Sequence, residues 1–403
     1  MDIDEARAAI EEHMLAQADS VGELLEQFKS RIPSALIDGP GWDKLVERTN
    51  GLPISLATSG FGFELRLHER EPRADLGLAL FEGSRSAAHF EAWSRSRPED
   101  ASTTAVVRLL GEMGREGAAL RRIAGTKLLL EYDVDPAHHG SFPDPGIFLY
   151  PTADALPGAG SVQEPEDMGV LADAVATATG WGPDTAERRH AERLFLARPP
   201  GAQIGGVGAF PARTRGLRLA ITGIGSTGEL TSFLERAGWP GRTSTFTPFV
   251  SDLEARGAFS HLAAHLDVHP GGVGPDLGVS FYAQDAQWVK DIAPWMGIID
   301  GLRAPGLVVP EKLSALAESW AGMETVFARR GMLLLVRGIH HFKMALVGDR
   351  FDEVKAYVFC LVSPPLPPGS GRRGELRDGR RRRGEREGSG RRQWNPPAAP
   401  AND

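Results

Sequence analysis

The sequence has 403 residues, of which 41% are apolar and 24% are charged, so a chain of this size can bury a large core. Its formal net charge is −8, but residues 372–403 contain ten arginines against five acidic residues, which leaves −13 for residues 1–371. A nucleic-acid surface needs clustered basic groups, so the acidic body excludes nucleic acid as its expected partner.

The start of the chain and its apolar segments predict a cytoplasmic protein with no membrane partner. Residues 1–17 are acidic and amphipathic, without the basic start and apolar centre of a signal peptide. The sequence has no apolar run of about 18 residues, the length that a membrane span requires. Cys360 is the single cysteine, which excludes an intrachain disulfide and a multi-cysteine metal site.

Strands and helices alternate along the predicted body. Strand regions show apolar side chains at every second position, broken by Gly- and Pro-containing turns. They are residues 61–83, 127–135, 146–152, 216–225, 261–284 and 340–360. Helical regions lie between them, at residues 86–95, 229–238, 287–302 and 311–322.

The short connections between strands predict antiparallel pairing, and the helices between them must cover one face of the sheet. The predicted fold class is therefore α+β. About nine strands in one antiparallel sheet tend to curl, and closure into a barrel removes exposed edges. We expect an antiparallel sheet curled into a barrel with helices outside, which leaves the polar face of each strand inside.

The domain prediction is one α+β barrel-like domain over residues 1–363, followed by a disordered tail over residues 364–403. The tail is rich in Pro, Gly and Arg and almost free of apolar residues. Such a segment buries too little surface to offset the entropy lost on ordering.

Cations and phenols at alternate strand positions are the main functional signal. Lysines are poor strand formers, yet the hairpin 340–360 carries Lys343 and Lys355, each beside a His or Tyr on the same face. Cations that converge inside a barrel repel one another, and a phosphate or diphosphate would relieve that cost. The alternative is that these side chains face solvent on a half-exposed sheet. The full set is Arg66, Arg218, Lys343, Lys355, Tyr357 and Tyr282, with Glu64 two residues before Arg66.

A second pattern indicates different chemistry. The segment HLDVH places His265 and Asp267 on one strand face, and a distant histidine such as His340 or His341 could join them. Two histidines and one carboxylate form the metal triad of non-haem iron oxygenases, so this metal site remains an alternative.

The strand pairs alternating with helices over residues 50–363, and a last strand that contains Lys355-x-Tyr357, resemble the αββα-barrel (ABBA-type) aromatic and peptide prenyltransferases. The resemblance implies an antiparallel barrel ringed by helices that binds an isoprenyl diphosphate through Lys, Arg and Tyr. It implies that Lys355 and Tyr357 contact the diphosphate, with Tyr357 also shielding the allyl cation. By position, Lys343 and Arg218 would be further ligands.

The resemblance also implies that Glu64 orients or deprotonates the acceptor. The expected function is transfer of an isoprenyl group from an allylic diphosphate co-substrate to a small aromatic molecule or a peptide, with no cofactor or metal required. The alternatives are the non-haem iron oxygenase and a non-catalytic protein that binds or matures a peptide.

Overall fold

The computed structural model describes residues 3–134, 144–151, 162, 164–182, 185–213, 215–283, 291–303 and 306–364. Contacts divide the chain into residues 1–365 and residues 366–403. The predicted tail, residues 364–403, lies outside the described residues except for Pro364. None of the helices in the described ranges is both long and apolar enough to span a membrane.

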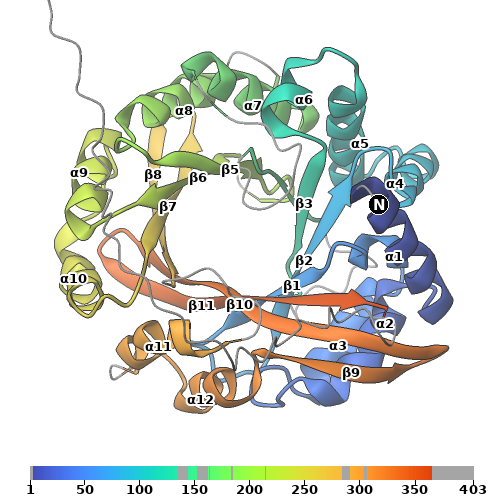
Figure 1. Cartoon of the computed structure of the whole chain (residues 1–403). Helices are drawn as coiled ribbons and strands as arrows, with labels where there is room; N and C mark the ends of the chain where they lie inside the picture. Colours follow the sequence, from blue (N-terminus) through green and yellow to red (C-terminus); the bar gives the residue numbers. More distant parts are fainter. Residues whose placement is uncertain are drawn as a thin grey trace, which may run out of the picture. The chain divides into compact units, whose positions relative to one another are not determined.

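Ten antiparallel strands close into a barrel (Figure 1). Each strand pairs with its neighbour in the order β11-β1-β2-β3-β4-β5-β6-β7-β8-β10, and β10 pairs with β11 to close the ring; β9 extends the sheet beyond β10 on the outside of this ring. The strands are β1 (Phe61–Arg66), β2 (Ala74–Phe81), β3 (Lys127–Tyr132), β4 (Gly146–Leu149), β5 (Gln203–Ala209), β6 (Leu217–Ile224), β7 (His261–His269), β8 (Gly272–Tyr282), β9 (Gly322–Ala328), β10 (Gly331–Val347) and β11 (Arg350–Ser363).

Helices surround the barrel on its outer side (Figure 1). Several begin at a side chain that accepts a hydrogen bond from the first turn, such as Ser84 before α4 and Ser226 before α9. The α-helices are α1 (Ile3–Gln17), α2 (Val21–Phe28), α3 (Gly39–Thr49), α4 (Arg85–Ser96), α5 (Ala101–Gly114), α6 (Ala119–Ala124), α7 (Pro165–Ala178), α8 (Ala186–Ala197), α9 (Thr227–Ala237), α10 (Thr247–Ala255), α11 (Met296–Leu302) and α12 (Pro310–Ser319).

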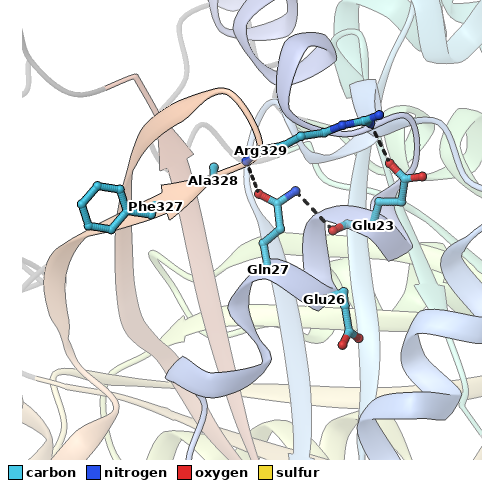
Figure 2. A pocket seen from close by; sticks show the side chains of 6 residues that line it. All are labelled: Glu23, Glu26, Gln27, Phe327, Ala328 and Arg329. Atoms are coloured by element: carbon cyan, nitrogen blue, oxygen red, sulfur yellow. Dashed lines mark hydrogen bonds and ion pairs between the residues drawn. The ribbon is translucent and has the colours of Figure 1, made fainter.

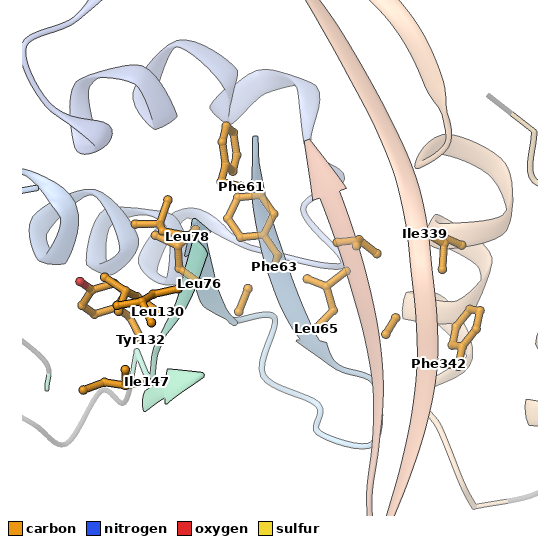
Figure 3. Packing of buried hydrophobic residues seen from close by; sticks show 14 of the residues in the cluster. Phe61, Phe63, Leu65, Leu76, Leu78, Leu130, Tyr132, Ile147, Ile339 and Phe342 are labelled. Carbon is orange, nitrogen blue, oxygen red and sulfur yellow. The ribbon is translucent and has the colours of Figure 1, made fainter. Parts of the chain in front are cut away.

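The core lies between the outer face of the barrel and the helices. Strand side chains alternate between the two faces, so Phe61, Phe63 and Leu65 of β1 point outward and are buried (Figure 3). Phe63 packs between Trp42 of α3 and Trp320, with ring centroids 6.0 and 6.4 Å apart. The intervening residues therefore point into the barrel.

The α+β class and the closed antiparallel barrel with outer helices are confirmed. Two strands were not predicted, β5 and β9, and β10 starts at Gly331, nine residues before the predicted hairpin. In the hairpin itself, β10 ends at Val347 and β11 starts at Arg350, so the turn lies at Gly348 and Asp349.

Candidate active site on the inner face of the barrel

All the residues singled out from the sequence lie at inward-pointing strand positions. Their side chains keep partial contact with solvent, as with Glu64 at 16% and Arg218 at 27% exposure, so the interior is not packed solid. They come from six strands that are consecutive around the ring. These residues are Arg218 of β6, His265 and Asp267 of β7, Tyr282 of β8, Lys343 of β10, Lys355 and Tyr357 of β11, and Glu64 and Arg66 of β1.

Lys355 holds two carboxylates. Its Nζ lies 2.7 Å from Oε1 of Glu64, and it also contacts Glu353. The phenol of Tyr357, directly opposite Glu64 in the register, donates a hydrogen bond to the same carboxylate. Burial alone would raise the pKa of Glu64, but the charges of Lys355 and Lys343 and these hydrogen bonds lower it to about 2. The carboxylate of Glu64 is therefore ionised and already bound by Lys355 and Tyr357.

The two arginines have carboxylate partners as well. Nε and Nη2 of Arg66 both donate to Oδ2 of Asp75 on β2, at 3.0 and 2.8 Å. Arg218 grips Asp267 with two parallel hydrogen bonds of 2.7 and 2.8 Å. The protein therefore supplies a counter-ion to each of the two arginines, although Arg218 still repels Lys343.

Lys343 differs from the other cations. No ion pair to it is found within the described part of the chain, and it is 9% exposed. Its stem lies across Gly278, where any Cβ would meet its Cε, and its Nζ lies 5.7 Å from the centre of the Tyr357 ring. Burial, with repulsion from Arg218 and Lys355, lowers the pKa of Lys343 to about 8 despite the attraction of Glu64 and Glu131. The site therefore contains a buried ammonium with an incomplete set of counter-ions.

Four stacked rings form a ladder across one wall of the inner face. The ring of His261 on β7 stacks on Tyr282, Tyr282 on His341 of β10, and His341 on Tyr357, with centroids 4.5, 5.2 and 4.2 Å apart. Burial, with the neighbouring positive charges, lowers the pKa of His341 well below its usual value, so its imidazole is neutral. We call these four residues the ring ladder. It presents π faces, and its His341 ring carries no positive charge at neutral pH.

The residues of the alternative metal site have other partners. Asp267 is occupied by Arg218, and Nε2 of His265 shares a hydrogen bond of 2.9 Å with the hydroxyl of Ser280. Within the described ranges, no three His, Cys, Asp or Glu side chains are arranged to hold a metal ion. The expected grouping of His265 and Asp267 with His340 or His341 as ligands is therefore not formed.

Several acidic residues of the inner face were missed, among them Asp75 and Glu131. Asp75 accepts from Arg66 and from the backbone N–H of Val134, and burial together with the charge of Glu64 raises its pKa to about 6 against the effect of Arg66. Glu131 lies on β3, two positions from the inward Leu129. The alternation of the segment KLLLEYDVD already places Glu131 on one face with Lys127.

A second concave surface lies outside the ring, between α2 and the β9–β10 turn (Figure 2). Its polar groups largely bind one another: the backbone N–H of Arg329 donates to Gln27, and the Arg329 guanidinium lies 3.6 Å from Glu23. Glu26, Phe327 and Ala328 complete the lining. None of these residues belongs to the inner face.

No protein-family model and no curated protein matches the sequence. Solved structures do match. The 5-dimethylallyltryptophan synthase from Streptomyces coelicolor is 15% identical, with a TM-score of 0.50 over 84% of this chain and 97% of that one. The same enzyme in complex with DMASPP and Trp gives 16% and 0.48, over 87% and 98% of the two chains. The prenyltransferase PriB in its apo form gives 14% and 0.47, over 87% and 96%.

The likeness covers nearly the whole length of the first of these enzymes and most of this chain. At such low identity it concerns the fold and not the individual residues. The chain therefore has the αββα-barrel fold of the aromatic prenyltransferases, the family that its sequence resembles.

Proposed function

We propose that this protein transfers an isoprenyl group from an allylic diphosphate to an aromatic acceptor, either a small molecule or a peptide. One observation carries the proposal beyond the fold: Lys343, a buried lysine with its pKa lowered to about 8, points into the barrel with no ion pair among the described residues. A diphosphate bound there would complete its charge environment and restore its ordinary pKa.

The diphosphate would lie over the hairpin of β10 and β11. Lys343 faces Lys355 across the register, and Tyr357 is the next inward residue along β11. Lys355 could share its charge between Glu64 and the diphosphate. Arg66 and Arg218 are held by Asp75 and Asp267, so we assign them to the support of the site rather than to direct contact with the diphosphate.

The chemical step needs stabilisation at both ends of the breaking bond. Cations neutralise the negative charge that develops on the departing diphosphate, and removal of one such donor costs about 3–4 kcal/mol in comparable oxyanion sites. The ring ladder, with Tyr282, His341 and Tyr357 at its centre, offers neutral π faces to the allyl cation. The step needs no metal if the lysines fill this role.

Binding and turnover test the proposal separately. Calorimetry should detect dimethylallyl or geranyl diphosphate, and mass spectrometry should detect prenylated product from a panel of indole, L-tryptophan, L-tyrosine and a tryptophan-containing tripeptide. Each assay is run with Mg²⁺ and with chelator, and equal rates are expected. Binding of neither diphosphate under either condition would overturn the prenyltransferase function and leave a peptide-binding protein.

The matched variants are Lys343→Met and Lys127→Met. Both lysines point inward, but Lys127 lies at the start of β3, away from the β10–β11 hairpin. Loss of a charge-assisted hydrogen bond of roughly 1.5–3 kcal/mol should weaken diphosphate binding by about ten- to a hundredfold in Lys343→Met. Lys127→Met should bind as the unmodified protein does.

A further inference from the structure

Two carboxylates on the inner face have opposite surroundings. Glu64 accepts hydrogen bonds from Lys355 and Tyr357, and its pKa is lowered to about 2. Glu131 makes no hydrogen bond or ion pair within the described ranges, although it points inward and is only partly exposed. A carboxylate that already accepts hydrogen bonds and has a low pKa is a poor proton acceptor near neutral pH. A carboxylate without such partners is a better proton acceptor.

The backbone around Glu131 leaves its carboxylate open. Its register partners on the two neighbouring strands are both glycines, Gly77 of β2 and Gly146 of β4, so no side chain flanks it there. The ring of Phe210 lies over Gly146, where any Cβ would collide with it. Phe210 packs edge-to-face on Phe148, with centroids 5.3 Å apart. Glu131 therefore adjoins an aromatic wall.

This wall and the lysine hairpin are contributed by different parts of the barrel. Phe148 belongs to β4 and Phe210 directly follows β5, whereas Lys343 and Lys355 belong to β10 and β11. Charged groups of three other strands act on Glu131: Lys343 of β10 and Arg218 of β6 attract it, and Glu64 of β1 repels it. An aromatic acceptor that packs against the wall would thus lie beside Glu131, while the hairpin remains available for the diphosphate.

We propose that Glu131 is the catalytic base that takes the ring proton from the prenylated acceptor; this inference depends on the proposed function. The allylic C–O bond breaks and the diphosphate leaves with its electron pair. A ring carbon of the acceptor then bonds to the allyl carbon. The proton on that ring carbon passes to the Glu131 carboxylate, and the electrons of the C–H bond restore the aromatic ring. Glu64 then positions Lys355 and Tyr357 and does not accept the proton.

The electrostatic surroundings suit this role. Burial and the negative charge of Glu64 raise the pKa of Glu131 to about 7, against the opposing effects of Lys343 and Arg218. A general base acts best when its pKa is near the working pH, because it is then both ionised and basic. The charged or titratable groups that act on Glu131 are Glu64 from β1, Lys343 from β10, Tyr357 from β11, Arg218 from β6, Asp133 after β3 and Tyr150 after β4.

The test separates ionisation of the diphosphate from proton removal. Without an acceptor, water captures the allyl cation, and this hydrolysis needs no ring proton to leave. Glu131→Gln should therefore lower the prenylation rate by about a hundredfold or more while leaving hydrolysis of dimethylallyl diphosphate unchanged. With ring-deuterated acceptor, Glu131→Gln should show a primary isotope effect that the unmodified protein lacks, because proton removal becomes rate-limiting. Glu131→Asp should recover part of the rate.

Three other results would contradict the assignment of Glu131 as the base or the proposed function itself. Prenylation by Glu131→Gln at the unmodified rate, or an equal loss of hydrolysis and prenylation, would overturn the assignment of Glu131 as the base. A primary isotope effect that appears in Glu64→Gln instead would assign proton removal to Glu64. An unmodified protein that neither hydrolyses the diphosphate nor prenylates any member of the panel would refute the proposed function itself, a result distinguishable from the others.

Discussion

The Nζ atom of Lys355 lies 2.7 Å from Oε1 of Glu64, and the same ammonium contacts Glu353, so one lysine bridges two carboxylates inside the barrel. Removal of one partner of a buried pair leaves an uncompensated charge and typically costs about 3–5 kcal/mol. We expect Lys355→Met to destabilise the protein by an amount in this range at pH 7, measured by urea unfolding. A neutral or stabilising effect would show that repulsion between Lys343 and Lys355 dominates.

The double variant Lys355→Met/Glu64→Gln provides the control. It removes both charges, so we expect it to be more stable than Lys355→Met alone.

The stability of the protein should also depend on pH through Glu64, and the sign of this dependence follows from its pKa. Because the folded pKa of Glu64 is about 2, below its ordinary value, its stabilising contribution is present above pH of about 4.5 and is lost as pH falls towards 2. Glu64→Gln should remove this part of the acid sensitivity.

Affinity for a diphosphate should depend on the ionisation of Lys343. Its pKa is lowered to about 8 in the free protein, and a bound anion would raise it. The ammonium is then already charged below pH 8, but must take up a proton on binding above it. We expect the calorimetric affinity for dimethylallyl diphosphate to fall as pH rises above about 8. Lys343→Arg stays charged and should bind without this fall; a pH-independent affinity in the unmodified protein would contradict the prediction.

Glu131 should affect the stability of the protein in the opposite sense to Glu64, because its stabilising contribution is lost as pH rises. Its folded pKa is raised to about 7, so the folded protein binds this proton more tightly than the unfolded chain does. The resulting stabilisation is complete below the ordinary pKa and is lost as pH rises to about 7. The melting temperature of Glu131→Gln minus that of the unmodified protein should therefore be larger at pH 8 than at pH 5. An equal shift at both pH values, measured by calorimetry, would show that Glu131 titrates normally.

The sequence predicts the barrel because its outer face is strictly apolar. In β1, Phe61, Phe63 and Leu65 alternate with Gly62, Glu64 and Arg66, and the period of two determines which side chains point inward. The ion pairs between neighbouring strands could not be predicted from the period of two within a strand. Arg218 meets Asp267 only because β6 and β7 pair in one register, and these strands are joined by a long connection that contains α9 and α10 rather than by a tight turn.

Strand β5 was missed for a physical reason. The segment QIGGVGA contains three glycines, which usually indicate a turn, because glycine loses the most entropy in a strand. Here the glycines make room for aromatic rings from β4 and beyond it: a Cβ on Gly206 would lie 3.3 Å from Tyr150, and one on Gly208 would collide with Phe148. Local propensity is thus overridden by packing on the inner face, which the sequence of β5 alone does not show.

Gly208 therefore provides a test of how tightly the aromatic wall is packed. A Cβ at this position would overlap both the carbonyl oxygen of Ile147 and the ring of Phe148, and the carbonyl belongs to the backbone of a paired strand. Gly208→Ala should destabilise the protein by about 1–3 kcal/mol, the cost typical of overpacking.

The matched control is Gly77→Ala on β2, where the nearest atom to a Cβ is 3.9 Å away. Neither glycine has a positive φ, so the two changes differ in space and not in backbone strain. Gly77→Ala should leave stability unchanged or raise it slightly, since alanine loses less entropy on folding. Equal urea midpoints for the two variants would show that Phe148 moves aside freely and that the wall beside Glu131 is not rigid.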